Sequence, residues 1–547
     1  MNSDPNNTIN ELTPAPVQDV IARNTLWNVA GRAWEAIAAL VLTPYIVWRL
    51  GLSEYGVWGL VASFSGYVGL LDLGFGSGYA KFIAEYAARG EQRRISQLIT
   101  SAVTLYAVLG VALAALCFPV LAYVATAFAS RMGVPDVNAG DLVFLVQYSF
   151  TLFLLGNCVA PFTSIQAGLQ RMDIANAVSF VMSIVKIAAT VYFIENGFGL
   201  RGLMYSSAIV LGVYALASLF IAFWLLPHLR VSFAHVSRRE FWSLYRYGWR
   251  AQVARLSNLI TFETDIIVVS MMYRTMGLAG AYKVGVELAN KVRQVPLMFL
   301  GAILPAASDL DAREDTTRLR RLYLVSTKYI AAITIPLALF STATADTIMR
   351  AWMGADMGDA AWVFRLIVIG YAANVLQGPG VSVALGKGRP DVQMNAGIIA
   401  MISNLVLTIT FAFAVGFLGV AAATAISMYI SMVWFLRAMR NMTGVTSRAI
   451  WREAVLWPCV ASLPGVVACV FIEVFAPAGS GRLESVSIML GAAAVFGAVY
   501  LAILRYLPFL DSFDAHFLEH TLKLNRVPGS TMWLRRARQR TVRDHAA

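Results

Sequence analysis

The sequence has few charged residues. Only 14% of its 547 residues are Asp, Glu, Lys or Arg, whereas an average soluble domain has about a quarter. Hydrophobic residues make up 58% of the chain. Water is therefore not the main solvent of this protein. The number of domains cannot be estimated from the chain length as it is for soluble proteins.

Cysteine is also scarce, and no signal peptide is evident. The four cysteines, Cys117, Cys158, Cys459 and Cys469, all lie in apolar stretches, so they are interpreted as small packing residues rather than as a disulfide or a zinc site. The polar first segment lacks the short apolar core and the cleavage site of a signal peptide. We expect it to be an uncleaved, disordered tail.

Motifs of catalysis are missing. Asp309 and Asp311 have the spacing of a metal-binding acidic pair in sugar-nucleotide transferases, but that chemistry needs a soluble α/β domain that no segment supplies. Gly74, Gly76 and Gly78 end an apolar run without the lysine-serine pair of a P-loop. The five histidines have no catalytic or metal-site spacing. We therefore expect no enzyme, no metal and no cofactor.

Long apolar runs are what the sequence has instead. A hydrocarbon core about 30 Å thick needs roughly 20 apolar residues per spanning helix. The pattern predicts an all-α polytopic membrane protein with about fourteen transmembrane helices, over residues 26–48, 55–75, 98–123, 142–167, 174–194, 202–226, 251–272, 281–306, 329–348, 363–385, 392–415, 421–436, 456–475 and 486–504.

An internal repeat divides these helices. Ser164, Gly168, Arg171 and Asp173 recur as Ser382, Gly386, Arg389 and Asp391. Two copies of six helices insert the same way up, so the repeat predicts two lobes around a central cleft. The predicted organisation is an N-terminal tail over 1–23, six-helix lobes over 24–228 and 229–440, a terminal helix pair over 450–505 and a basic tail over 506–547.

The positions of Lys and Arg predict the orientation. Cytoplasmic loops retain these residues, and the bias between alternate loops places both termini in the cytoplasm, with no outer loop long enough to form a domain. The basic tail is interpreted either as resting on anionic lipid headgroups of the inner leaflet or as a solvated disordered segment. The excess of positive charge suits such headgroups better than nucleic acid, for which no groove-reading motif exists.

Ionisable residues inside the predicted spans indicate the lining of the cleft. Each costs roughly 2.5–3.5 kcal/mol at mid-bilayer, so it should face protein or a watery cavity. The candidates lie on the first, fifth, seventh and eighth predicted helices: Arg32, Glu35, Lys186, Arg255, Glu263, Asp265, Lys283, Glu287 and Lys291. Their excess of cations suits a ligand with phosphates and hydroxyls. Salt bridges between helices, without ligand contact, are the alternative.

Four further charges lie near predicted helix ends. Asp72, Arg246, Arg250 and Arg365 are each close enough to the interface for the side chain to reach the headgroups. We therefore predict no role for them in a cleft.

Three segments carry a family resemblance. Residues 42–58, with the sequence LTPYIVWRLGLSEYGVW, together with 69–76 and 80–86, resemble the Wzx-like bacterial polysaccharide flippases of the multidrug/oligosaccharidyl-lipid/polysaccharide exporter superfamily. The similarity is sharpest within residues 24–100, whereas the helix number and the repeat extend it to the whole chain.

The resemblance implies a function and a site. Such a flippase moves an undecaprenyl-diphosphate-linked oligosaccharide from the cytoplasmic to the periplasmic leaflet of the bacterial inner membrane, by alternating access of two lobes. Combined with the charged lining of the cleft, this function predicts substrate contacts at Arg32, Arg255, Lys283, Lys291 and Lys186, and gates or sites for a coupled H⁺ or Na⁺ at Glu35, Glu263, Asp265 and Glu287. Membrane lipids and other polysaccharide-assembly proteins are the expected partners of a monomer.

Two alternatives stay open. A multidrug or organic-cation antiporter of the same superfamily should have an acidic and aromatic cleft, which the excess of Lys and Arg disfavours. An integral-membrane glycan polymerase or ligase normally needs a long outer loop or a soluble domain, and the predicted topology has neither.

Overall fold

A computed structural model describes residues 17–72, 76–132, 138–232, 235–273, 275–475 and 481–509. All regular secondary structure in these ranges is helical, which confirms the all-α fold. The predicted N-terminal tail lies outside the described residues up to position 16, and the basic tail lies outside them beyond Phe509. The first helix begins at Val17, nine residues before the predicted span.

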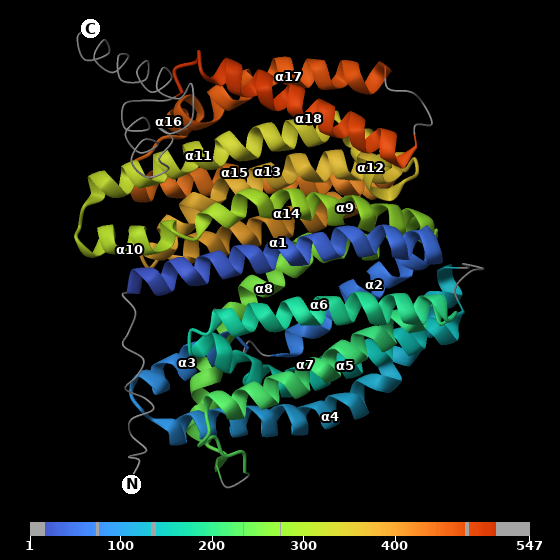
Figure 1. Cartoon of the computed structure of the whole chain (residues 1–547), viewed down its shortest axis with the longest axis vertical. Coiled ribbons are helices and arrows are strands. Elements are labelled where there is room, and N and C mark those ends of the chain that lie inside the picture. Colours follow the sequence, from blue (N-terminus) through green and yellow to red (C-terminus); the bar gives the residue numbers. More distant parts are fainter. Residues whose placement is uncertain are drawn as a thin grey trace, which may run out of the picture. The chain divides into compact units, whose positions relative to one another are not determined.

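The apolar runs form helices because a helix satisfies its own backbone polar groups, as a hydrocarbon solvent requires. Figure 1 labels them in chain order. The helices are α1 Val17–Leu50, α2 Leu52–Val68, η1 Gly69–Asp72, α3 Gly76–Ala88, α4 Gln92–Met132, α5 Ala139–Gly168, α6 Met172–Glu195, α7 Gly199–Leu225, α8 Arg238–Tyr273, α9 Met276–Leu297, η3 Met298–Leu300, α10 Ile303–Ala312, α11 Thr316–Ala343, α12 Ala345–Met353, α13 Gly358–Gly386, α14 Pro390–Ala414, α15 Phe417–Thr443, α16 Ser447–Ile450, η4 Trp451–Val455, α17 Leu456–Phe475 and α18 Arg482–Leu504.

Each of the fourteen predicted segments overlaps at least one helix. Within the described ranges, eleven helical segments are long and apolar enough to cross a membrane, so the chain is a multi-pass membrane protein. Helices α1, α2 and α8 are not among the eleven. Helix α2 has only 17 residues, and α8 carries charged residues along much of its length. The total of fourteen spans stays a prediction.

The chain divides into two compact units, Met1–Gly280 and Ala281–Ala547. Helix α8 belongs to the first unit, where its buried Glu240 accepts a hydrogen bond of 2.6 Å from the hydroxyl of Tyr86 in α3 and lies 3.2 Å from Arg94 of α4. The boundary between compact units therefore follows α8, whereas the predicted lobe boundary precedes it. The lobe boundary describes the sequence repeat and stays a prediction.

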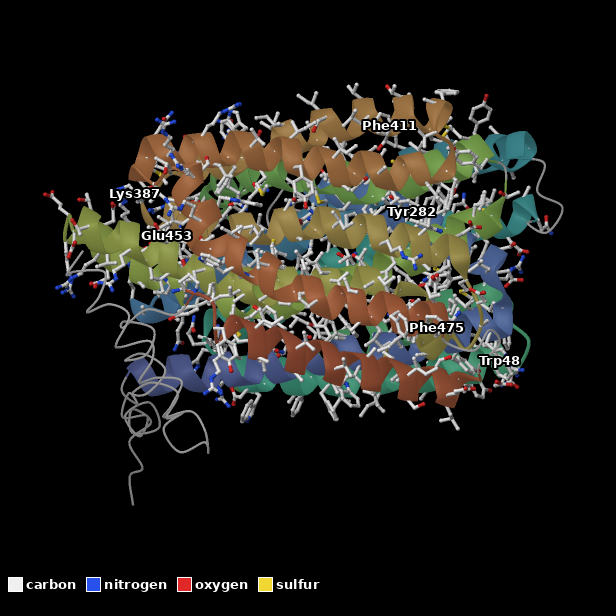
Figure 2. All side chains as sticks on the ribbon, turned by 90° about the horizontal axis from the view of Figure 1, so that it is seen from above. Trp48, Tyr282, Lys387, Phe411, Glu453 and Phe475 are labelled. Atoms are coloured by element: carbon white, nitrogen blue, oxygen red, sulfur yellow. The ribbon has the colours of Figure 1, made fainter. Side chains whose placement is uncertain are left out.

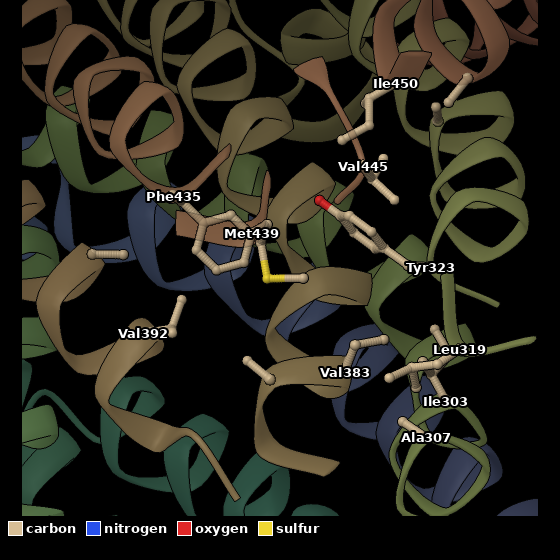
Figure 3. Packing of buried hydrophobic residues seen from close by; sticks show 14 of the residues in the cluster. Ile303, Ala307, Leu319, Tyr323, Val383, Val392, Phe435, Met439, Val445 and Ile450 are labelled. Carbon is tan, nitrogen blue, oxygen red and sulfur yellow. The ribbon is translucent and has the colours of Figure 1, made fainter. Parts of the chain in front are cut away.

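The core of the second unit lies among α10, α11, α13 and α15. Phe435 of α15 and Tyr323 of α11 pack around Gly380 of α13, where an added Cβ would lie 2.8 Å from the Phe435 ring. Figure 3 shows these two rings beside Met439 of α15. Tight packing of this kind fixes the relation of the three helices within the unit.

The sequence repeat is also a repeat of local structure. Arg171 binds Asp173 through two hydrogen bonds of 3.1 Å each, and Arg389 binds Asp391 in the same way at 2.9 and 2.8 Å. A glycine precedes each joint, and a Cβ there would clash with a short helix: Gly168 with Ile83 of α3 at 2.6 Å, and Gly386 with Ala307 of α10 at 2.7 Å. In each copy, therefore, a short helix packs against the joint between the fourth and fifth predicted spans of the repeat.

The terminal helices α17 and α18 pack against α11 and α12 of the second unit. Tyr500 of α18 donates a hydrogen bond of 2.9 Å to the carbonyl of Ala332 in α11. Glu473 of α17 accepts bonds from the backbone NH and the hydroxyl of Thr347, at 2.9 and 2.6 Å, and lies 3.5 Å from Arg350. A carboxylate at the start of α12 satisfies amides that the helix leaves unpaired.

This contact gives a stability prediction. Glu473→Ala should lower the free energy of unfolding by about 1–2 kcal/mol, because the first turn of α12 loses its acceptor and Arg350 loses its counter-charge. The unfolding midpoint of the purified protein in detergent measures the change. Glu484→Ala, which removes an exposed carboxylate from the first turn of α18, is the control and should lie within about 0.5 kcal/mol of wild type. Equal midpoints for both variants would contradict the capping role.

Candidate functional site: charged clusters on α8 and α9

Within the first unit, a set of polar contacts joins α2 and η1 to α8. Asp72 is only 7% exposed, and its carboxylate accepts a hydrogen bond from the hydroxyl of Tyr106 in α4. Nη1 of Arg255 lies 3.4 Å from Oδ2 of the same carboxylate. The side chain of Gln252 donates a 2.6 Å bond to the carbonyl of Leu70. We call Ser63, Tyr67, Asp72, Arg255, Glu263 and Thr264 the α2–α8 polar seam.

The seam continues along both helices. Ser63 donates a 2.7 Å hydrogen bond to Oε2 of Glu263, and the hydroxyls of Tyr67 and Thr264 are bonded to each other. Asp265, 3% exposed, lies one residue further along α8. Arg255 and Glu263 therefore lie on one seam, and each has a polar partner on α2 or η1.

A glycine makes room for the arginine of the seam. A Cβ at Gly69 would lie only 2.7 Å from Nη2 of Arg255. The guanidinium therefore crosses the end of α2 where no side chain intervenes. Its side chain is still 45% exposed, so Asp72 covers only part of the guanidinium.

Within the second unit, α9 carries the predicted charged stripe. Lys283, Glu287 and Lys291 follow each other at intervals of four residues and are all half-buried. Residues at this spacing lie on one face of a helix. Gly285 marks a different face, where a Cβ would lie 2.7 Å from the carbonyl of Ala360 in α13. The stripe therefore places two cations and one carboxylate on a face of α9 that differs from the face packed against α13.

Arg293 adds a charge that is not among the predicted site residues. Its guanidinium lies 4.8 Å from the centroid of the Tyr371 ring of α13. Both residues line a small cavity between α9, α11 and α13, together with Thr334. A cation over an aromatic face is stabilised when water is partly excluded. The cue in the sequence was the position of Arg293 near the end of the charged helix, but only packing shows its aromatic partner.

The remaining candidates are placed differently. Lys186 is exposed on α6, and it belongs to neither the seam nor the stripe. The side chains of Arg32, Glu35 and Arg250 lie outside the described residues. The structure therefore brings Arg255 and Glu263 of α8 onto one seam, with Asp265 beside it. It places Lys283, Glu287 and Lys291 of α9 on one stripe. Their role in binding or gating stays a prediction.

Two of the charges assigned to the interface have partners within the protein. Asp72 is buried in the seam, so the interpretation that its side chain reaches the headgroups was wrong; its partners lie on other helices, which a position near a helix end did not reveal. Arg365 lies 2.5 Å from Asp346 and donates a bond of 3.3 Å to the carbonyl of Thr342. Arg246 is exposed. For Arg365 and Arg246 a position at the interface stays a prediction.

Comparisons with known proteins give the family context. A family model described as a polysaccharide biosynthesis protein matches residues 21–311. A probable flippase, AglR, of Haloferax volcanii is 21% identical over 77% of this chain and 83% of its own length. A putative O-antigen transporter of Shigella flexneri is 20% identical over 74% of this chain and 94% of its own length.

Solved structures share the fold. The lipid II flippase MurJ, in an inward closed conformation, has a TM-score of 0.66 at 14% identity and covers 87% of this chain and 97% of its own. An inward-facing MATE family multidrug resistance transporter of the MOP superfamily has a TM-score of 0.57 at 16% identity and covers 75% of this chain and 96% of its own. At such identities these two likenesses show the architecture alone.

Proposed function

Because the chain belongs to the polysaccharide biosynthesis protein family, we propose that it is a flippase that moves a lipid-linked glycan across the membrane. The carrier in this proposal is undecaprenyl diphosphate, and the glycan is a precursor of a cell-surface polysaccharide. The membrane is the bacterial inner membrane, with both termini in the cytoplasm. The named relatives support the transport class, since they are a probable flippase and a putative O-antigen transporter.

The charged stripe of α9 is the observation that carries the substrate class. Lys283 and Lys291 place two cations on the same helix face as one carboxylate, Glu287, at half-buried positions. Lysine ammonium groups bind phosphate oxygens strongly where water is partly excluded. A diphosphate with an attached sugar matches this pattern better than an organic cation does.

The multidrug antiporter is the second candidate, because a MATE transporter shares the fold. Its substrate is expected to need carboxylates and aromatic rings in excess of Lys and Arg. Arg255 in the seam and the two lysines of the stripe disfavour it. An enzyme is disfavoured on a different ground, since the relatives named above are transporters.

We further propose that transport proceeds by alternating access of the two repeat lobes in a monomer. Arg255, Lys283 and Lys291, with Arg32 and Lys186, would contact the headgroup. Glu35, Glu263, Asp265 and Glu287 would act as gates or as sites of a coupled H⁺ or Na⁺, because a carboxylate exchanges a lysine or arginine partner for either ion.

Loss of the gene tests the function. Cells that lack the protein should accumulate complete lipid-linked repeat units on the cytoplasmic side of the membrane, measured by extraction and mass spectrometry with a membrane-impermeant label. Accumulation of incomplete units would indicate an enzyme of assembly instead. Unchanged lipid-linked glycan together with drug sensitivity would indicate the antiporter.

Glu287→Gln tests ion coupling. Neutral glutamine neither takes up a proton nor binds Na⁺ as a carboxylate does, so transport by this variant in proteoliposomes should lose its dependence on an imposed H⁺ or Na⁺ gradient. Glu314→Gln, at an exposed position after α10, is the matched control and should keep the gradient dependence of wild type. If Glu287→Gln and the double variant with Glu35→Gln respond to both gradients like wild type, the coupling assignment is wrong.

A further inference from the structure

A polar pocket lies within the second unit, and no residue of the α9 stripe belongs to its lining. It has a volume of about 800 Å³ and is formed by the early part of α11, the segment from Thr446 to Trp457, and the residues after α18. Its lining includes Lys328, Arg448, Arg452, Glu453, Trp457 and Phe509. This volume lies within the range of small-molecule sites, roughly 300–1,000 Å³.

The wall of the pocket contains an unusual helical turn. Residues Trp451–Val455 form a π-helix, η4, and the amide of Leu456 bonds to the carbonyl of Trp451, five residues earlier. Pro458 follows closely, and its ring has no amide for the carbonyl of Ala454 and would crowd it in a regular α-helix. The wider turn relieves this conflict and places Arg452 and Glu453 on the pocket wall. Single π-turns of this kind occur often at functional sites.

The charge of the lining is mainly positive. Lys328, Arg448 and Arg452 face one carboxylate, that of Glu453. Arg448 and Arg452 are exposed, and no ion pair joins either guanidinium to a carboxylate among the residues that the structure describes. Both therefore have donors available for an anion. Guanidinium groups bind phosphate through two parallel hydrogen bonds, which gives geometry as well as energy.

The other part of the lining is apolar. Leu324, Val325, Leu456, Trp457 and Phe509 lie in the same pocket. Nζ of Lys328 lies 4.9 Å from the centroid of the Phe509 ring, and Lys328 itself is only 8% exposed. The lining of the pocket therefore has two parts, one with exposed arginines and one with aromatic and aliphatic side chains. A ligand that fits both parts has an anionic head and a hydrocarbon chain.

The pocket lies at the charged end of the helices of its unit. In Figure 2, Glu453 and Lys387 lie toward one end of these helices, while Phe411 and Phe475 lie toward the other. The excess of Lys and Arg that predicts cytoplasmic loops includes Arg313 and Arg320 near the start of α11 and Arg437 near the end of α15. On that assignment the pocket opens at the level of the inner-leaflet headgroups.

We propose that this pocket binds one anionic phospholipid, with its phosphate on Arg448 and Arg452 and its hydrocarbon chain against Leu456 and Trp457. Lys328 adds a buried positive charge behind the phosphate. Free phosphate shares the first contact but leaves the apolar wall unused. The site belongs to the helix pair α17–α18 and its junction with α11, so it does not depend on the proposed transport function.

Native mass spectrometry of the purified chain tests the proposal. The probes are phosphatidylglycerol, zwitterionic phosphatidylethanolamine and inorganic phosphate. Wild-type protein should retain one phosphatidylglycerol in preference to phosphatidylethanolamine, and Arg448→Gln/Arg452→Gln should weaken that binding about tenfold or more. Arg437→Gln/Arg440→Gln removes two exposed arginines from the nearby end of α15, outside the pocket lining, and should leave the binding unchanged.

A second measurement needs no arginine variant. Brominated phosphatidylglycerol should quench the tryptophan fluorescence of wild type more than that of Trp457→Phe, whereas brominated phosphatidylethanolamine should quench both equally. Equal lipid binding by both arginine pairs, or equal quenching of wild type and Trp457→Phe, would overturn the proposal. So would binding of inorganic phosphate that displaces the lipid at equal concentration, because the ligand would then be the free anion.

Discussion

Asp72→Ala should lower the free energy of unfolding by about 2–3 kcal/mol. The substitution leaves the buried hydroxyl of Tyr106 without its carboxylate acceptor and takes the counter-charge from Arg255. Removing one partner of a buried ion pair is costly because the other partner keeps its desolvation penalty. Arg255 is half-exposed and can turn toward water, which offsets part of this desolvation penalty. The expected loss of stability is therefore smaller than for a fully buried pair. Chemical unfolding in detergent measures it.

Two further variants make this result specific to the seam. Asp72→Asn keeps an oxygen that can accept from Tyr106 but has no charge for Arg255, so its loss should lie between wild type and Asp72→Ala. Asp141→Ala breaks the pair of Asp141 with Arg201, whose side chains are 35% and 49% exposed, and should cost no more than about 1 kcal/mol. If Asp72→Ala lowers the free energy of unfolding no more than Asp141→Ala does, the contacts of Asp72 in the seam do not stabilise the fold.

Lys283→Gln/Lys291→Gln should reduce glycan transport about tenfold or more. Under the proposed function both ammonium groups bind the diphosphate, and a hydrogen bond with a charged partner contributes about 1.5–3 kcal/mol, where 1.36 kcal/mol corresponds to a factor of ten in rate. Export of labelled glycan from proteoliposomes or cells measures the loss. The amount of folded protein in the membrane is measured in parallel.

The matched control removes the same charge elsewhere. Arg320→Gln/Arg437→Gln replaces two exposed cations at the ends of α11 and α15 and should leave transport within about twofold of wild type. A stripe variant that folds and transports as well as this control would show that the two lysines do not contact the substrate. A stripe variant that transports an organic cation more efficiently than wild type would favour the antiporter.

The candidate site was predictable in part. The charges of α8 and α9 stand out because charge is rare in apolar runs, and spacing alone places Lys283, Glu287 and Lys291 on one face. Asp72 was misjudged because its partners are 34 and 183 residues away, at Tyr106 and Arg255. A position near the end of an apolar run does not tell whether a neighbouring helix covers it.

The π-turn and the breaks in the helices show the same limit. The π-helix Trp451–Val455 before Pro458 and the pocket beside it were not predicted from the sequence. The predicted spans 55–75 and 281–306 each contain a break, at η1 and η3, followed by the short helices α3 and α10. Their apolar residues continue through the break, so hydropathy does not mark it.

The order of residues along the chain is enough to establish that the protein is helical, multi-pass and internally repeated. These properties follow from local causes: a hydrocarbon solvent admits apolar helices, and a repeated joint such as Arg171 with Asp173 closes through residues two apart. The packed helices were needed to show which charges are paired, which glycines allow close packing and where α17 and α18 attach. Those outcomes depend on contacts between residues far apart in the chain, whose energies arise only when the helices have packed together.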